Sequence, residues 1–203
     1  HSTAVGDEGG FAPDLKSNEE ALSFISEAVS NAGYKLGSEV FFALDVAATE
    51  FYKNNKYNLS SEKKKLSGEE MIKYLVALKK KYPIFSIEDG CAEDDWKHWV
   101  KLNAQLGQST LLIGDDLFVT NCKRLERGIS EQSANGILIK PNQIGTLSET
   151  LDAINLAKEN SIENVISHRS GETEDNFIAD LSIATNSKYI KTGSVTRSER
   201  CSK

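Results

Sequence analysis

The chain has 203 residues, with 24 lysines and arginines against 30 aspartates and glutamates, and its formal net charge is -6. Apolar residues make up 39% of it and prolines number three, which excludes a disordered, collagen-like or low-complexity chain. The acidic balance gives a nucleic-acid backbone no general attraction, and the longest basic runs are lysine triplets at 63–65 and 79–81. We therefore expect one folded domain, residues 1–203, whose main partner is not nucleic acid.

No stretch approaches the roughly 20 apolar residues that span a bilayer, and His1 opens no charged-then-apolar signal pattern. Cys91, Cys122 and Cys201 are odd in number and widely spaced, which argues against a disulfide framework and a CxxC zinc site. We expect isolated thiols in a reducing cytoplasm. Because the chain has no initiator Met and its last residues close no recognisable element, we expect a piece of a longer protein.

In chain order, an amphipathic helix capped by Ser17 and ended by Gly33 comes first. Apolar or β-branched runs typical of buried strands follow, at 41–46, 84–87, 111–113, 136–139, 164–166 and 189–190. Between them, apolar positions three and four apart predict helices over 69–81, 95–106, 121–130, 147–160 and 176–186. Strand and helix are thus expected to alternate throughout, which indicates a parallel sheet with helical crossovers.

Each predicted strand ends at an ionisable residue. In chain order these residues are Asp45, Glu88, Asp115, Lys140, His168 and Lys191. In a doubly wound sheet the ligand crevice lies at one switch point, whereas a barrel brings all its strand ends to one mouth. We therefore predict a barrel. Because the usual eight-stranded form needs about 250 residues, we expect two further strands before His1.

Three of these strand ends are carboxylates, Asp45, Glu88 and Asp115, and like charges on adjacent strands repel unless a cation lies among them. A set of oxygen donors without Cys or clustered His favours Mg²⁺ over Zn²⁺. Any one of these acids alone is better explained as a helix cap or a solvent-facing group. Three together predict a divalent metal site.

Lys140 and Lys191 each follow apolar strand residues. A lysine held beside a metal ion and a second lysine has a lowered pKa and can serve as a base. The alternatives for either lysine are snorkelling from the edge of the core, pairing with an acid, or forming a Schiff base.

The polar loop 167–175 concentrates hydrogen-bond donors after a predicted strand. Arg169 can form a fork to phosphate oxygens and Ser170 adds a hydroxyl, so the loop suits an anionic substrate group, although such loops are often ordinary surface. His168 alone is more typical of a structural hydrogen-bonding residue. Near the start, Glu8 lies in a glycine-flanked loop that could reach over a barrel mouth, and by itself this loop is only a turn.

Seven motifs together resemble the enolase family, the phosphopyruvate hydratases of glycolysis. They are GDEGGFAP (6–13), ALDVAATEFY (43–52), SIEDG (86–90), GDDLFVTN (114–121), ILIKPNQIGTLSET (137–150), SHRSGETED (167–175) and IKTGS (190–194). The likeness runs along the whole chain in the family's order. Gly90 and Cys91 stand where many enolases carry proline and phenylalanine, and the glycine resembles the bacterial-type sequences.

The resemblance implies a two-domain protein, with an N-terminal α+β cap and a C-terminal TIM barrel whose first crossover departs from strict alternation. These 203 residues would be an incomplete barrel, about strands three to eight, without the cap domain, the first two strands and the final helix. We expect such a piece alone to be inactive, because it leaves strand edges unpaired.

The resemblance also implies residue roles. Asp45, Glu88 and Asp115 match the ligands of a tightly held Mg²⁺, which with a second Mg²⁺ stabilises the ene-diolate form of the substrate. Lys140 matches the base that removes the proton from carbon 2 of 2-phosphoglycerate, and Lys191 matches a partner of the substrate carboxylate.

Four further residues match groups around the rest of the substrate. Glu8 matches the acid that assists departure of the carbon-3 hydroxyl, and His168 lies beside that leaving group. Arg169 and Ser170 match phosphate binders. Substrate binding would therefore involve Glu8, Lys140, His168, Arg169, Ser170 and Lys191.

The function so implied is that of a lyase, a carbon–oxygen hydro-lyase that reversibly dehydrates 2-phospho-D-glycerate to phosphoenolpyruvate in the cytoplasm. A homo-oligomer, a dimer or an octamer, is implied as well. Two alternatives stay open: a superfamily member acting on another carboxylate substrate, and a binding role such as plasminogen binding by enolases that are secreted or on the cell surface.

Overall fold

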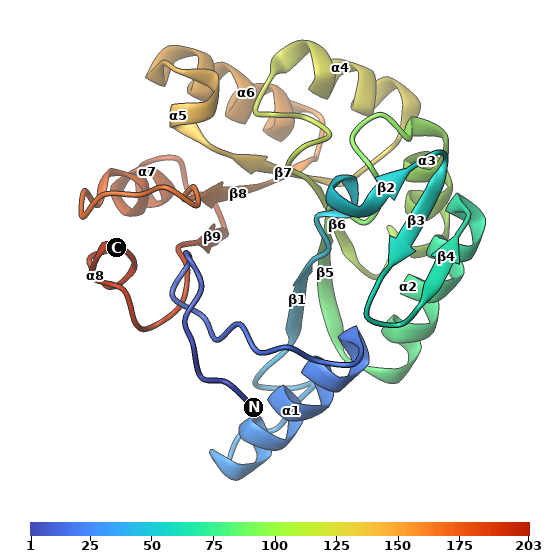
Figure 1. Cartoon of the computed structure of the whole chain (residues 1–203). Coiled ribbons are helices and arrows are strands. Elements are labelled where there is room, and N and C mark those ends of the chain that lie inside the picture. The colour runs from blue at the N-terminus through green and yellow to red at the C-terminus, as the bar shows by residue number, and fades with distance from the viewer. The chain divides into compact units, whose positions relative to one another are not determined.

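The computed structural model describes every residue from 1 to 203, and Figure 1 labels its helices and strands. The larger sheet contains the six predicted strands: β1 (Phe42–Asp45), β5 (Ile84–Glu88), β6 (Leu111–Gly114), β7 (Gly136–Ile139), β8 (Glu163–Ser167) and β9 (Tyr189–Lys191). Their order in the sheet, β1-β5-β6-β7-β8-β9, follows the chain. A doubly wound sheet reverses its order at a switch point, so this topology is the one expected of part of a barrel. The predicted α/β fold class is confirmed.

Helices lie before, between and after these strands, and the apolar spacing predicted most of them. They are α1 (Asn18–Asn31), α2 (Gly68–Lys81), α3 (Trp96–Leu106), α4 (Cys122–Glu131), α5 (Pro141–Ile144), α6 (Leu147–Glu159), α7 (Phe177–Ala184) and α8 (Ser198–Cys201). The Ser17 side chain accepts the backbone N–H of Glu20 at the start of α1, and Ser67 and Glu70 form a capping box on α2. The short helices α5 and α8 were not predicted.

Between β1 and α2 the predicted strict alternation is wrong. This segment forms a 3₁₀ turn, η1 (Ala48–Phe51), and three short antiparallel strands, β2 (Tyr52–Lys53), β3 (Lys56–Leu59) and β4 (Lys64–Leu66). Asn54 and Asn55 join β2 to β3 with φ of 53° and 57°, and two left-handed residues in succession suit a tight hairpin turn. Tyr57, fully buried on β3, anchors this small sheet.

The chain divides into two compact units. Unit 1 comprises residues 1–14, 118–127 and 136–203, and unit 2 comprises residues 15–117 and 128–135.

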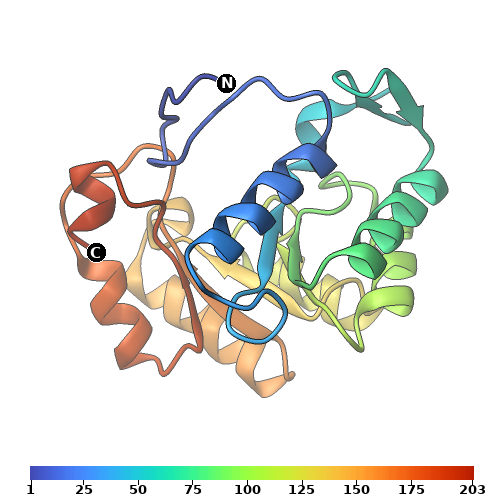
Figure 2. The ribbon, with the colours of Figure 1, turned by 90° about the horizontal axis from the view of Figure 1, so that it is seen from below.

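Each unit has helices packed against its own strands. In unit 2, α2 and α3 pack on each other, and α2 also contacts β3 and β4; Leu75 and Trp99 are among the buried side chains of these helices. In unit 1, α6 contacts β7 and β8, and α7 contacts β8 and β9, as the orange and red helices of Figure 2 show. Every strand pair described within a unit is parallel in the larger sheet, so the carboxyl ends of the strands in each unit share one edge.

The cysteines carry no disulfide: Cys91 is buried, Cys201 is exposed and all three are free, as predicted. None of the helices combines the length and the apolar character that crossing a membrane requires.

Candidate active site

In unit 2, strand register brings the three predicted metal-binding carboxylates into one row. Asp45 pairs with Glu88 across β1 and β5, and Glu88 pairs with Ile113 across β5 and β6. Paired residues on neighbouring strands share a face, and so do residues two apart along one strand. Asp115 follows Ile113 by two positions and therefore continues the row just past the end of β6. Register thus places these three acids at the ends of neighbouring strands, on one face of the sheet.

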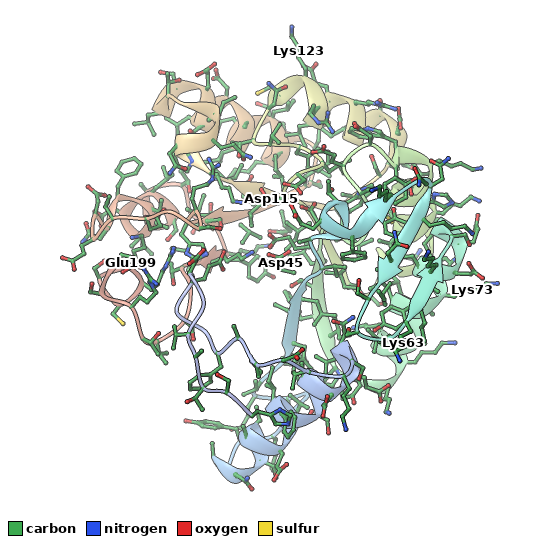
Figure 3. The ribbon with its side chains drawn as sticks, viewed as in Figure 1. Asp45, Lys63, Lys73, Asp115, Lys123 and Glu199 are labelled. Carbon is green, nitrogen blue, oxygen red and sulfur yellow. The ribbon has the colours of Figure 1, made fainter.

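The carboxylates of this row differ in exposure. Glu88 is 5% exposed and Asp115 is 9% exposed, whereas Asp45 is open to solvent; Figure 3 labels Asp45 and Asp115. The Asp45 carboxylate also accepts the backbone N–H of Ala47 at 3.2 Å, which fixes the turn after β1. Two buried acids and an exposed one, all offering oxygen, are the donor set that a hard divalent cation such as Mg²⁺ prefers.

Asp89 is a buried carboxylate that the sequence analysis did not single out. Its Oδ1 accepts the backbone N–H of Asp115 at 2.9 Å, and its Oδ2 accepts that of Asp116 at 2.8 Å. Burial, together with the negative charges of Asp115 and Asp116, raises the pKa of Asp89 to about 8. Asp89 therefore anchors the turn that presents Asp115.

Asp89, Asp115 and Asp116 form a second candidate metal set, because one carboxylate oxygen from each lies within 4.8 Å of the others. Asp115 belongs to both sets. The two hydrogen bonds to the Asp115–Asp116 turn also explain the position of Asp89, so this carboxylate can support the turn without binding a metal.

In unit 1, strands β7, β8 and β9 place the two predicted lysines in one row. Ile139 pairs with Ile166, and Ser167 pairs with Lys191. Lys140 is the residue after Ile139, so it lies level with Ser167 and Lys191. Neighbouring strands are about 4.8 Å apart, which puts the two lysine Cα atoms about 10 Å apart. Both side chains can therefore reach one small substrate.

Thr120 holds the backbone at Lys140, another contact that the sequence analysis missed. Its hydroxyl donates to the Leu138 carbonyl at 3.2 Å and accepts the Lys140 N–H at 2.9 Å. Thr120 is fully buried and has a φ of 54°, so the preceding loop delivers its hydroxyl at the end of β7 in a fixed position. The hydrogen bond of the Lys140 backbone N–H therefore does not depend on the lysine side chain.

Glu8 and His168 come together in unit 1, although 160 positions separate them in the chain. His168 Nε2 lies 3.2 Å from Glu8 Oε2, and the imidazole is 1% exposed. The close approach of His168, helped by the positive charges of Lys191 and Arg200, lowers the pKa of Glu8 to about 2 although burial opposes the shift. Glu8 is therefore a carboxylate at neutral pH in this state. The acid role implied by the resemblance requires its pKa to rise when an anionic substrate enters.

Glu8 makes a pH-dependent contribution to stability whose sign follows from this shift. Its pKa is 4.5 when unperturbed and about 2 in the fold, so the stabilisation is complete above about pH 4.5 and is lost as the pH falls towards 2. The Glu8 side chain is 43% exposed, so we expect less than about 1 kcal/mol. Urea unfolding of the wild type and Glu8→Gln should give a stability difference that shrinks over this window, with Asp7→Asn as the charge control. A difference that stays constant with pH would contradict the pairing.

The two predicted phosphate binders lie on the loop after β8. Arg169 is half-buried and its backbone N–H donates to Glu172 Oε1 at 3.0 Å, while Ser170 is exposed. Arg200, which the sequence analysis missed, donates to the carbonyls of Arg169 and Ser170 at 2.7 and 2.6 Å. The structure thus fixes the backbone of this loop and leaves the Ser170 hydroxyl on the surface.

Gly193 lets the segment after β9 pass close to this site. Its φ is 91°, and a Cβ there would lie 2.6 Å from Arg200 Cδ and 2.8 Å from the Glu8 carbonyl oxygen. We expect Gly193→Ala to lower the free energy of unfolding by about 2 kcal/mol, from strained backbone and overlap. Urea unfolding measures the change. Gly171→Ala is the control, because a Cβ at Gly171 would meet nothing within 4 Å, and equal effects of the two variants would refute the packing argument.

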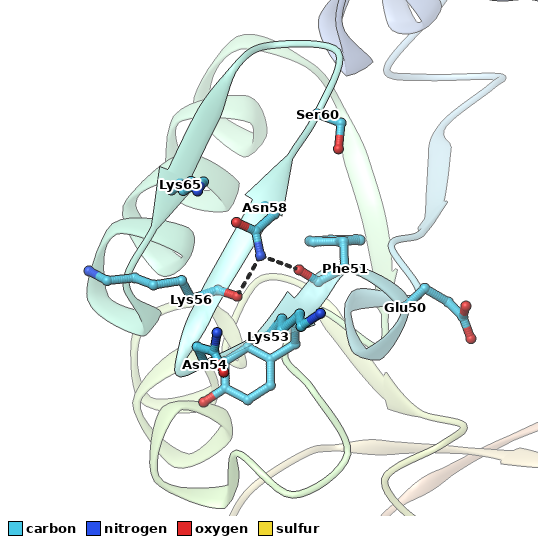
Figure 4. A pocket seen from close by; sticks show the side chains of 9 residues that line it. Glu50, Phe51, Lys53, Asn54, Lys56, Asn58, Ser60 and Lys65 are labelled. Carbon is cyan, nitrogen blue, oxygen red and sulfur yellow. Dashed lines mark hydrogen bonds between the residues drawn. The ribbon is translucent and has the colours of Figure 1, made fainter.

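A hollow of about 530 Å³ lies elsewhere in unit 2, on the small antiparallel sheet (Figure 4). Lys53, Lys56 and Lys65 are among its lining residues. The Asn58 amide donates to the carbonyls of Phe51 and Lys56, at 3.3 and 3.4 Å. None of the predicted site residues lines this hollow.

A parallel sheet whose strands follow the chain order is the arrangement that (β/α)-barrel proteins use. Residues 1–203 match the family model described as "Enolase, C-terminal TIM barrel domain". The chain belongs to this family, which confirms the resemblance at the family level.

Proposed function

We propose that the protein is a magnesium-dependent lyase that reversibly dehydrates 2-phospho-D-glycerate to phosphoenolpyruvate in glycolysis. The observation that carries the proposal is the cluster at the strand ends of unit 1, where Lys140 lies level with Lys191 and Glu8 contacts His168. A cytoplasmic location and a dimeric or octameric assembly form part of the proposal.

The residues of unit 1 would each have a separate role in the reaction. Lys140, in its neutral form, takes the proton from carbon 2, and the Lys191 ammonium binds the substrate carboxylate. The carbon-3 hydroxyl then leaves as water with a proton taken from Glu8, which must hold that proton in the substrate complex, beside His168. One C–H bond and one C–O bond break, and the carbon–carbon double bond forms.

Asp45, Glu88 and Asp115 would hold Mg²⁺ by their carboxylate oxygens. A bound Mg²⁺ would supply positive charge, which stabilises negative charge that grows on a substrate carboxylate. A Lys base combined with Mg²⁺ is the known pattern of the enolase superfamily.

Two features of the loop after β8 favour a phosphorylated substrate. Arg169 offers a guanidinium fork and Ser170 an exposed hydroxyl, both suited to phosphate oxygens. Turnover of non-phosphorylated carboxylic acids, with none of 2-phosphoglycerate, would instead support another superfamily reaction.

The direct test is an assay of phosphoenolpyruvate formation from 2-phosphoglycerate by the full-length protein. Mg²⁺ is titrated and then removed with EDTA, and circular dichroism checks that the protein stays folded. We expect product formation that rises with Mg²⁺ and stops with EDTA. Folded protein that gives no product at any Mg²⁺ concentration would refute the proposed reaction.

A second candidate function is surface binding of a protein such as plasminogen. The observation that favours it is the hollow on the antiparallel sheet with Lys53, Lys56 and Lys65 at its wall. Binding that persists in Lys140→Ala and falls in the double variant Lys53→Ala/Lys56→Ala would establish a role separate from catalysis. Binding that is unchanged in the double variant would exclude this surface.

A further inference from the structure

Arg200, on α8, is a charged side chain that is 3% exposed. Its Nη2 donates to the carbonyls of Asp7 and Ser170 at 3.0 and 2.6 Å, and its Nη1 donates to the carbonyl of Arg169 at 2.7 Å. A single guanidinium therefore joins the loop that carries Glu8, the loop that follows His168, and the last helix.

The same guanidinium also meets the imidazole of His168. Arg200 Nη1 lies 2.5 Å from His168 Nδ1. A guanidinium stays charged and has only donors, so Nδ1 must offer its lone pair to accept this hydrogen bond. A hydrogen on Nδ1 would face the N–H of Arg200. While this contact holds, the imidazole carries one hydrogen, and that hydrogen is on Nε2.

The other ring nitrogen faces Glu8. Nε2 lies 3.2 Å from Glu8 Oε2, at an approach too oblique for a well-formed hydrogen bond. Nε2 is otherwise buried, and the Glu8 side chain is 43% exposed, so the carboxylate has room to align with a donor at Nε2. The Glu8 carboxylate is therefore within reach of the N–H on Nε2 and can accept a hydrogen bond from it once the two groups align.

We propose that Arg200 is a positioning residue that fixes His168 as the neutral, Nε2-protonated tautomer and so directs one hydrogen-bond donor at the Glu8 carboxylate. The inference deepens the proposed function and rests on it in one respect, namely that Glu8 and His168 act at the leaving hydroxyl. In that setting His168 serves as a hydrogen-bond donor to oxygen, and the proton that leaves with water passes by way of Glu8.

The first test is NMR of the full-length protein labelled with ¹⁵N-histidine. Ring nitrogen shifts distinguish the two neutral tautomers and the doubly protonated ring, and the spectrum of His168→Gln identifies the His168 signals. We expect the Nε2-protonated neutral pattern at neutral pH. A hydrogen on Nδ1, alone or in a doubly protonated ring, would overturn the proposal. The wild-type spectrum reports the tautomer of His168 directly and needs neither an Arg200 variant nor an activity assay. A failure of the positioning proposal is therefore distinguishable from a failure of the proposed reaction.

The second test replaces the donor. Arg200→Met keeps much of the aliphatic stem and removes the N–H groups, so we expect the Nε2-protonated pattern to be lost. We also expect kcat to fall about 10- to 100-fold, with a smaller change in KM. Arg197→Met is the matched control, because Arg197 is exposed three positions earlier and pairs with Glu199. A folded Arg200→Met protein with an unchanged His168 spectrum would refute the positioning role; if this variant does not fold, the wild-type spectrum remains the deciding measurement.

Discussion

Lys140→Ala in the full-length protein is expected to lower kcat by about 10⁴-fold while the fold survives. The side chain provides the base of the proposed reaction, whereas the backbone of Lys140 is held by Thr120, whose hydroxyl accepts its N–H at 2.9 Å. Alanine keeps that N–H, so the end of β7 should keep its position. Phosphoenolpyruvate formation measures the loss, and urea unfolding measures the stability.

A matched lysine variant separates the loss of a base from the loss of a positive charge. Lys188, in the same unit, is exposed and pairs with Glu163, so Lys188→Ala should leave kcat unchanged. Exchange of the carbon-2 hydrogen with D₂O should fall with turnover in Lys140→Ala. Exchange that continues while product formation stops would assign Lys140 to the second step, and retained turnover would remove it as the base.

Much of the fold was predictable because local patterns and tertiary structure agree. The helices begin at side chains that cap them, such as Ser17 and Ser67, and the six strands of the larger sheet coincide with the apolar runs. The small antiparallel sheet was missed because its strands are two to four residues long and rich in lysine. Only Tyr57 and Leu59 are buried there, which is too little for a periodic signal.

The placement of the candidate site residues at strand ends was predictable for a different reason. Parallel strands in register deliver successive carboxyl ends to one edge, so Asp45 and Glu88, or Ser167 and Lys191, are neighbours by construction. The anchoring residues could not be predicted in this way. Asp89, Thr120 and Arg200 act through backbone N–H and carbonyl groups of other segments, and those contacts leave no periodic pattern in the sequence.

Asparagine variants at two different aspartates separate the two candidate metal sets. Asp115 belongs to both sets, so its replacement should weaken Mg²⁺ binding whichever set holds the ion. A variant at Asp115 therefore does not distinguish the two sets. Asp45 belongs only to the in-register row, and Asp116 belongs only to the cluster with Asp89. The informative comparison is therefore Asp45→Asn against Asp116→Asn.

We expect Asp45→Asn to raise the half-saturating Mg²⁺ concentration of the full-length protein by about 100-fold or more, and Asp116→Asn by less than about 10-fold. Asparagine keeps the size of the side chain but removes the charge that attracts the cation. Asp116 needs only its backbone N–H to bind Asp89, and asparagine retains that group. Calorimetric Mg²⁺ titration measures both effects, with Asp152→Asn on the exposed face of α6 as the control. The opposite order of effects would assign the ion to Asp89, Asp115 and Asp116, and would make Asp89 a ligand instead of a support for the turn.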